Sequence, residues 1–261
     1  MSLPTRDEIS LDKALLERVR SRKWFYEFEL ADGSRTQSYL PAGVEKIHAT
    51  RLAMLEAALS ARFDADLSGV SVVDLACHEG WFALHLARRG ATVLGLDVRD
   101  AHVEDALLMA RATETKGFKA RTFDIEEARP DDVGVHDVTL MLGLLYHLEN
   151  PMRALRLARA VTRKALFIET QVVPHMSGKV DWGSYAFQRE MVGVFGIVDE
   201  LGEEHAPEAG TGGICLAPSI DALEWLLKKV GFGHVERIPP PDDGYEQHVG
   251  NKRVMFAAYP D

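Results

Sequence analysis

The chain has 261 residues, 46% of them apolar, which is enough for one substantial hydrophobic core in a single globular unit. Its formal net charge of −10 argues against a nucleic acid as partner, because binding a phosphate backbone depends on clustered Lys and Arg. The chain has two cysteines, a polar amino terminus and no apolar stretch of the roughly 20 residues that a bilayer span requires. We therefore expect a cytoplasmic protein without a disulfide scaffold or a membrane partner.

The first 44 residues predict a helix followed by a hairpin. Apolar residues at helical spacing indicate a helix over 8–21, and alternating apolar residues indicate strands over 24–30 and 35–40. The turn residues 31–34 join the two strands. We expect residues 1–44 to form an extension of a main domain that covers 45–261 and opens with a helix to about residue 61.

From Gly69 onward, short apolar runs alternate with helical segments, a pattern typical of a parallel sheet with helices on both faces. Strands are predicted over 70–75, 91–97, 118–123, 136–142 and 164–171, with helices over 80–89, 101–115 and 151–161. The stretch 172–217 is too long for an ordinary connection and is a candidate lid or substrate insertion. A helix opened by Pro218 and Ser219 and strands over 233–238 and 253–259 complete a doubly wound α/β fold.

The turn after the first of these strands carries the first candidate site. It reads Asp74-Leu75-Ala76-Cys77-His78-Glu79-Gly80, and its small residues Ala76 and Gly80 permit close approach of a ligand. In a doubly wound sheet, ligands bind outside the carboxyl ends of the strands. The next strand ends in Asp97, 23 residues after Asp74, where a carboxylate can accept both ribose hydroxyls of an adenosine. The pair predicts an adenosine-containing ligand.

The glycines of this turn distinguish a dinucleotide from S-adenosylmethionine. A dinucleotide fold places G-x-G-x-x-G against the pyrophosphate. Here those positions hold Ala76, His78 and Trp81. A ligand without phosphates tolerates such side chains, so the turn favours S-adenosylmethionine.

These motifs resemble the class I S-adenosylmethionine-dependent methyltransferases over about residues 45 to 259. The resemblance implies strand order 3-2-1-4-5-7-6 with an antiparallel seventh strand. It also implies that Val98 lies beside the adenine, that Asp124-Ile125 meets the adenine edge and that Arg51 holds the methionine carboxylate. The resulting set of cofactor residues is Arg51, Asp74, Ala76, His78, Gly80, Asp97, Val98, Asp124, Ile125 and Leu142.

Within that superfamily the chain is most similar to the group that includes the tRNA wobble-uridine carboxymethyltransferases. The motifs behind this are Asp74 to Gly80, Leu145 to Pro151, Ile168-Glu169-Thr170, Pro218-Ser219 with Leu226-Leu227 and Gly231-Phe232, and Glu246-Gln247, together with the hairpin that contains Trp24 and Asp32-Gly33. The resemblance implies modification of tRNA as an alternative function.

Candidate acceptor-side residues lie at the edge where methyl donor and acceptor should meet. Tyr146 and His147 follow the fourth strand, and His147 has an intrinsic pKa suited to a general base. Glu169 ends the fifth strand, while Trp182 and Tyr185 belong to the insertion and could contact the substrate. No recognisable set of metal ligands is present, so we expect no catalytic metal.

The sequence therefore predicts a methyltransferase that acts on an oxygen or nitrogen of a small molecule. Three alternatives stay open: modification of tRNA, intramolecular attack on the cofactor that releases methylthioadenosine, and cofactor binding without catalysis. The sequence carries no signal for the oligomeric state.

Overall fold

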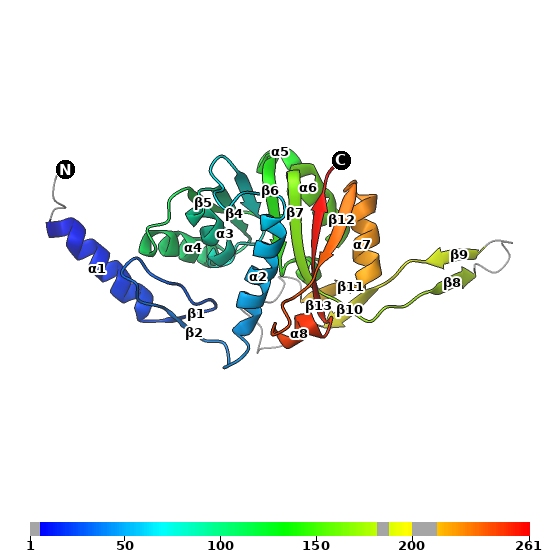
Figure 1. Ribbon diagram of the computed structural model, residues 1–261, viewed down its shortest axis with the longest axis horizontal. Coiled ribbons are helices and arrows are strands. Elements are labelled where there is room, and N and C mark those ends of the chain that lie inside the picture. Colours follow the sequence, from blue (N-terminus) through cyan, green and yellow to red (C-terminus); the bar gives the residue numbers. More distant parts are fainter. Residues whose placement is uncertain (1–5, 182–187, 200–212) are drawn as a thin grey trace.

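The computed structural model describes residues 6–181, 188–199 and 213–261 of the chain. A seven-stranded sheet with helices on both faces lies at its centre (Figure 1). In the order in which they pair, its strands are β12 (His234–Ile238), β13 (Arg253–Tyr259), β7 (Thr162–Gln171), β6 (His136–Leu142), β3 (Ser71–Asp74), β4 (Thr92–Asp97) and β5 (Phe118–Thr122). Only β13 in this sheet runs against its neighbours. Counted along the chain from β3 and read from β5, the order is 3-2-1-4-5-7-6, which confirms the predicted fold.

The two faces of the sheet are buried in two separate hydrophobic clusters. In β3, Val72 belongs to one cluster and Val73 to the other, as the two-residue repeat of a strand requires. The first cluster includes side chains of α2 (Lys46–Ser60), α3 (Trp81–Arg88) and α4 (Asp100–Ala112). The second includes side chains of α5 (Pro130–Val133), α6 (Pro151–Val161) and α7 (Ile220–Lys229). Because both faces are covered, the central strands β3, β6, β7 and β13 are buried over most of their length, whereas the edge strand β5 is polar and largely exposed.

The amino-terminal extension differs from the predicted hairpin. It contains α1 (Arg6–Arg20) and two short strands, β1 (Lys23–Trp24) and β2 (Gln37–Ser38), which pair parallel. The antiparallel pairing is reduced to a bridge between Glu29 and Arg35 beside the turn. The alternating side chains at 24, 26, 28 and 30 are buried in the first cluster. The Glu79 carboxylate accepts hydrogen bonds from the backbone amides of Phe25 and Tyr26, which a regular hairpin would use for strand pairing. Packing against the main domain thus replaces part of the strand pairing, while backbone hydrogen bonds from Thr36 to Phe28 and from Tyr39 to Trp24 remain.

The segment 172–217 contains two antiparallel strand pairs in its described parts. β8 (Gly178–Asp181) pairs with β9 (Gln188–Met191), and β10 (Phe195–Asp199) pairs with β11 (Ile214–Pro218). The β8–β9 pair projects from the body at the end opposite to α1 (Figure 1). The β11 residues Cys215 and Ala217 pack against Tyr146. The role of the segment as a lid stays a prediction.

Among the described residues, no helix is both long and apolar enough to cross a membrane.

Candidate functional site

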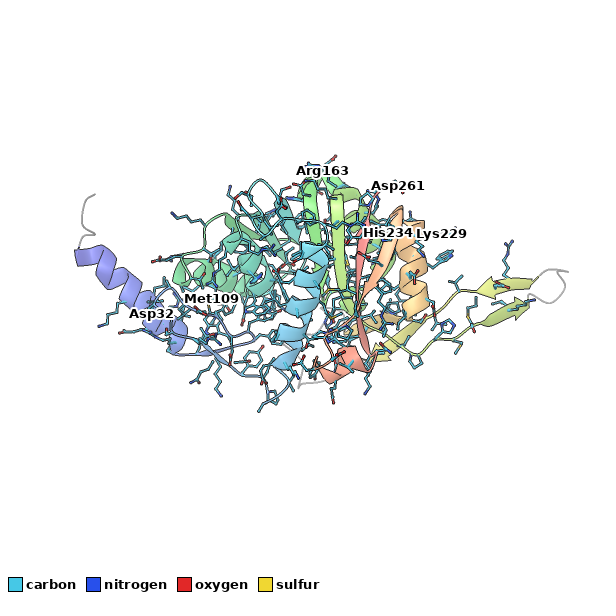
Figure 2. All side chains as sticks on the ribbon, in the orientation of Figure 1. Asp32, Met109, Arg163, Lys229, His234 and Asp261 are labelled. Atoms are coloured by element: carbon cyan, nitrogen blue, oxygen red, sulfur yellow. The ribbon has the colours of Figure 1, made fainter. Side chains whose placement is uncertain are left out.

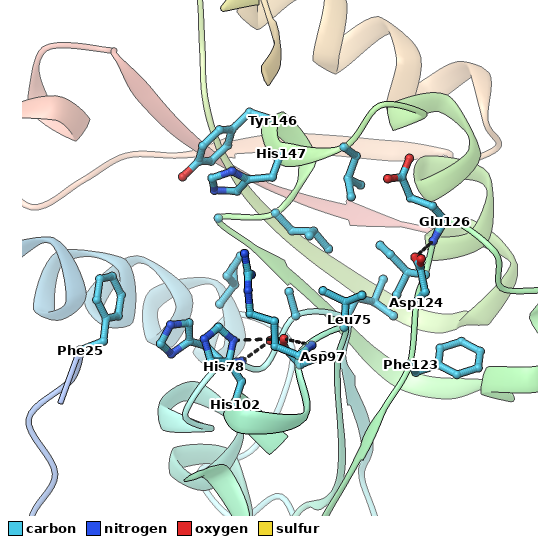
Figure 3. A pocket seen from close by; sticks show the side chains of 18 of the residues that line it. Phe25, Leu75, His78, Asp97, His102, Phe123, Asp124, Glu126, Tyr146 and His147 are labelled. Carbon is cyan, nitrogen blue, oxygen red and sulfur yellow. Dashed lines mark hydrogen bonds and ion pairs between the residues drawn. The ribbon is translucent and has the colours of Figure 1, made fainter. Parts of the chain in front are cut away.

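A cavity opens at the carboxyl ends of the parallel strands and encloses about 1010 Å³ of space, part of it continuous with solvent. Of the ten predicted cofactor residues, eight line this cavity: Arg51, Ala76, His78, Asp97, Val98, Asp124, Ile125 and Leu142. Tyr146 and His147 line it as well, on the side opposite to Asp97 (Figure 3). The structure thus brings the predicted adenosine-side and acceptor-side residues to one cavity.

Asp97 is the most firmly held residue of the adenosine side. Its Oδ2 accepts a hydrogen bond from the His78 amide (2.9 Å), and its Oδ1 accepts one from the Arg99 amide (3.0 Å). Nδ1 of His102, a residue that the sequence did not single out, lies 3.1 Å from Oδ1. Burial acts to raise the pKa of Asp97, but His102 and the two amides outweigh it and hold the pKa below its usual range. The side chain is therefore a fixed carboxylate in the cavity wall.

His78 occupies a position in the turn where a glycine is common in the resembled superfamily. Its backbone keeps a left-handed conformation, with φ of +50°. The His78 ring lies beside the His102 ring, with centroids 3.9 Å apart. Burial and the neighbouring His102 lower the pKa of His78 to about 3, so the imidazole is neutral. Both ring nitrogens are buried without a hydrogen-bond partner within the described chain, which suits a residue that meets a polar ligand.

Asp74 and Gly80 lie behind the lining of the cavity. Asp74 is 2% exposed, and burial raises the pKa of its carboxyl to about 7. Gly80 precedes α3 with a φ of +82°, and a Cβ there would lie 3.1 Å from the Cβ of Ala106 in α4. These placements favour a role in shaping the turn, and direct contact with the cofactor stays a prediction for both residues.

The acceptor side is built around Tyr146 in the short helix η1 (Leu145–His147). Its ring centroid lies 4.0 Å from that of His147. The Tyr146 hydroxyl accepts a hydrogen bond of 2.7 Å from Nη2 of Arg253, the first residue of β13. Arg253 also lines the cavity. Because β13 runs antiparallel, its first residue lies at the edge where the parallel strands end, and this topology was a signal that could have identified Arg253.

Glu169 does not line the cavity, and its contact with substrate stays a prediction. The residue is fully buried behind the wall. Its carboxylate lies 3.2 Å from Nε of Arg51, 2.9 Å from Nη1 of Arg253 and 3.1 Å from Nε2 of His248 in α8 (Glu246–Val249). Burial opposes ionisation, but Arg253 and Arg51 hold the pKa of Glu169 well below its usual range. Glu169 therefore acts on the cavity through the arginines that it binds.

Arg51 reaches the cavity as the resemblance implied, because the backbone opposite leaves room for it. Gly143 follows β6 with a φ of +73°, and a Cβ there would lie 2.9 Å from Nη2 of Arg51. A larger residue at 143 would displace the guanidinium. The glycine and Glu169 together define the position of Arg51.

The amino-terminal extension contributes Phe25 and Tyr26 to the cavity wall, which the sequence did not predict. The Glu79 carboxylate accepts hydrogen bonds from both of their amides, at 3.0 Å and 3.1 Å. The Tyr26 ring stacks on Trp81, with an interplanar angle of 4°. These contacts join the extension to the turn that follows β3. The remaining unpredicted lining residues are Ile47, Leu75, Arg99, His102, Phe123, Glu126, Gly143, Leu144 and Leu148.

Two predictions about the site are not settled by these contacts. Trp182 and Tyr185, predicted substrate residues, lie outside the described residues. In the described ranges no cluster of three or more His, Cys, Asp or Glu side chains is arranged for a metal ion, and the absence of a catalytic metal stays a prediction.

The fold and the cavity define a class of α/β proteins that bind an adenosine-containing ligand at the carboxyl ends of a parallel sheet. The profile of a methyltransferase-domain family matches residues 47–236. The chain belongs to this methyltransferase family. Membership confirms the predicted enzyme class, an S-adenosylmethionine-dependent transferase, and its cofactor.

Curated relatives match part of the chain. The ubiquinone biosynthesis O-methyltransferase of Acinetobacter baylyi is 28% identical over 97 residues, which is 37% of this chain and 41% of that protein. The mitochondrial ubiquinone biosynthesis O-methyltransferase of Arabidopsis thaliana is 30% identical over 128 residues, which is 46% of this chain and 39% of that protein. The chain thus matches less than half the length of either relative.

Solved structures match nearly the whole chain. The amino-terminal domain of EvdMO1 with SAH bound has a TM-score of 0.69 at 19% identity and covers 99% of this chain and 98% of that one. The same domain in the presence of SAH and D-fucose has a TM-score of 0.68 at 19% identity and 98% coverage of both chains. Magnesium protoporphyrin IX methyltransferase from Synechocystis PCC 6803 with bound SAH has a TM-score of 0.57 at 16% identity, covering 97% of this chain and 95% of that one. At these identities the likeness shows the fold.

Proposed function

We propose that this protein transfers the methyl group of S-adenosylmethionine to a hydroxyl oxygen of a small molecule. One observation carries the proposal: the fixed carboxylate of Asp97 and the hydroxyl of Tyr146 line one cavity at the carboxyl ends of the sheet. The curated relatives are O-methyltransferases, and a sugar was present with one structural neighbour, which supports an oxygen acceptor. Nitrogen is the second acceptor atom that the same geometry could serve.

The residues of the cavity fit the cofactor. Asp97 is ionised and its Oδ2 accepts one hydrogen bond within the described chain, so a lone pair is left for a ribose hydroxyl. Arg51 lines the cavity with a guanidinium that can bind the methionine carboxylate in a charge-assisted pair. The neutral His78 offers buried nitrogens to a polar group of the ligand.

The cofactor, when bound, supplies a methyl group already activated by its sulfonium leaving group. The protein must then hold the acceptor in line, exclude water and accept one proton. Tyr146 orients the acceptor hydroxyl, and its neighbour His147 accepts the proton as general base. Phe25 and Tyr26 of the extension close one side of the cavity against water.

The proposal is tested by the fate of labelled cofactor. Purified protein is incubated with S-adenosylmethionine carrying a ¹³C-labelled methyl group, together with a small-molecule extract or with tRNA, and the products are analysed by mass spectrometry. We expect S-adenosylhomocysteine and one labelled small molecule, and much less of both from the control Asp97→Ala at the same limiting cofactor concentration.

Three results would contradict the proposal. Label in tRNA would favour the resemblance to wobble-uridine enzymes, to which the net charge of −10 is poorly suited. Methylthioadenosine in place of S-adenosylhomocysteine would indicate intramolecular attack on the cofactor. Tight cofactor binding without any product, whether the small-molecule extract or tRNA is supplied, would indicate a protein that binds the cofactor without catalysis.

A further inference from the structure

Two arginines share one buried carboxylate beside the cavity. Glu169 lies 3.2 Å from Arg51 and 2.9 Å from Arg253, and all three side chains are at most 7% exposed. The residues come from different elements, α2, β7 and β13, which meet at the edge where the parallel strands end. Arg253 also donates to Oε1 of Gln247 at 3.1 Å. Arg253 is thus held by hydrogen bonds, whereas Arg51 makes a charge contact with Glu169 that lacks hydrogen-bond geometry.

The charges of this cluster do not balance among its own three members. The buried Asp74 carboxyl also interacts with Arg51 but offsets the surplus only in part, because burial raises its pKa to about 7. Two guanidiniums and one carboxylate leave a surplus of one positive charge, and both arginines line the cavity. A buried charge is costly unless a ligand or another residue pairs with it. The methionine carboxylate of the cofactor carries the one negative charge that would complete the cluster.

Arg253 has a second contact that Arg51 lacks. Its Nη2 donates to the Tyr146 hydroxyl at 2.7 Å, while its Nη1 binds Glu169. Arg51 approaches the same carboxylate from the other oxygen, Oε2. Glu169 therefore lies between the guanidinium assigned to the cofactor and the guanidinium that holds the acceptor-side tyrosine.

We propose that Glu169 and Arg253 are positioning residues with a double role: they set the positive charge available to the cofactor through Arg51, and Arg253 fixes Tyr146 for the acceptor. This inference rests on the proposed function. It makes the affinity for the amino-acid end of the cofactor depend on Arg253 even without direct contact between them. Affinity for the adenosine end of the cofactor should not depend on Arg253.

Binding of two probes tests the charge role without knowledge of the acceptor. Calorimetric titration compares S-adenosylhomocysteine, which has the methionine-derived carboxylate, with methylthioadenosine, which lacks it. Arg253→Met removes the surplus charge and should weaken S-adenosylhomocysteine binding by about tenfold, while methylthioadenosine binding stays within about twofold. Arg163→Met is the matched control, because Arg163 is an exposed arginine at the opposite end of β7 (Figure 2).

A second substitution separates an indirect effect from direct contact. Adding Glu169→Gln to Arg253→Met restores the original surplus charge of the cluster, so affinity for S-adenosylhomocysteine should return to within about threefold of the wild type. The double variant also avoids an unpaired carboxylate and keeps the test open if the single variant folds poorly. Loss that persists in the double variant would show that Arg253 binds the cofactor itself and would overturn the charge role.

The tyrosine role has its own readout. In protein labelled with ¹³Cζ-tyrosine, the Tyr146 signal is identified by its absence from Tyr146→Phe. The chemical shift of this signal should change in Arg253→Met and remain changed in the double variant, because neither variant retains the guanidinium that donates to the Tyr146 hydroxyl. An unchanged signal, or unchanged S-adenosylhomocysteine affinity in Arg253→Met, would overturn the inference. If the wild type binds neither probe, the proposed function itself fails.

Discussion

The two sides of the cavity are assembled in different ways. On the adenosine side, Asp97 is held by the amides of His78 and Arg99 and by His102, all within 19 residues of it in the chain. On the acceptor side, Arg253 binds partners that are 84 and 107 residues away, Glu169 and Tyr146. The first side uses local backbone donors, and the second uses buried charged side chains from distant elements.

This difference predicts where the protein tolerates substitution. Backbone amides keep their positions when a nearby side chain is changed, so a variant on the adenosine side should lose ligand affinity while it keeps its fold. Removal of one member of a buried ion cluster leaves the others without a partner. A variant on the acceptor side should therefore lose stability as well as activity.

The largest effect is expected at Glu169. Glu169→Ala leaves two buried guanidiniums without their shared carboxylate, and it should lower the free energy of unfolding by about 3–5 kcal/mol in urea denaturation. Arg163→Ala removes an exposed arginine at the other end of β7, and it should cost about 1 kcal/mol or less because its buried partner Asp137 keeps Lys164 and the Ser71 amide. Equal losses of unfolding free energy in the two variants would show that the buried cluster contributes no more to stability than the exposed arginine does.

Next in size is the effect of Tyr146→Phe on turnover. Loss of the hydroxyl removes the group that orients the acceptor, and kcat should fall by roughly 10- to 1,000-fold. Affinity for S-adenosylmethionine should stay within about tenfold, because Asp97 and Asp124 on the other side supply the ribose and adenine contacts. If Phe is nearly silent and Ala is damaging, only the ring face matters. Normal turnover of Tyr146→Ala would remove the acceptor site from this position.

The same contrast explains which parts of the fold and of the site could be predicted from the sequence. The alternation of apolar runs and helices predicted a parallel sheet with helices on both faces, and the residues around Asp74 and Asp97 predicted an adenosine site at its edge. The strand order and the places of Val98 and Asp124 came from the family resemblance, which itself rests on short motifs of neighbouring residues. Arg253 was not predicted, although the expected order already placed the last strand antiparallel beside β7. The sequence does not show that the guanidinium at the start of this strand meets Glu169 and Tyr146, which are far away in the chain.

Glu169 shows the limit of reasoning from strand ends alone. A polar residue near the end of a parallel strand was expected to face the crevice. Two residues earlier, Phe167 belongs to the core cluster that includes α2, and the two-residue repeat turns Glu169 to the same face. There it meets Arg51 from α2. The residue type was informative, but its direction depended on tertiary packing.

On the adenosine side, Asp97→Ala should weaken S-adenosylmethionine binding by about 1.5–3 kcal/mol, the scale for lost charge-assisted hydrogen bonds. The melting temperature without ligand should fall less than in Glu169→Ala, because the donors that lose Asp97 line the cavity or adjoin it, whereas Glu169 is fully buried between two arginines. Asp100→Ala is the control, since this nearby carboxylate does not line the cavity. Calorimetric titration with unchanged affinity in folded Asp97→Ala would remove the ribose assignment.

The smallest effect concerns the attachment of the extension to the adenosine side. Glu79 is buried beneath Phe25 and Tyr26 and accepts their amides, and burial raises the pKa of its carboxyl to about 7. An unfolded chain titrates this group near its ordinary value of 4.5. The folded state therefore binds the proton more tightly. The resulting stabilisation is complete below about pH 4.5 and is lost as the pH rises through 7.

Glu79→Gln isolates this contribution, because the amide keeps an oxygen for the two backbone donors but does not titrate. Relative to the variant, the wild type should lose about 1–2 kcal/mol of unfolding free energy between pH 5 and pH 8, measured by urea denaturation at each pH. Glu104→Gln, on an exposed position of α4, should show no such trend. Glu169 should contribute none either over this range, because its arginines hold its pKa far lower. A difference between wild type and Glu79→Gln that is constant with pH would mean that Glu79 is ionised throughout, and the pH sensitivity assigned to the adenosine side would then be absent.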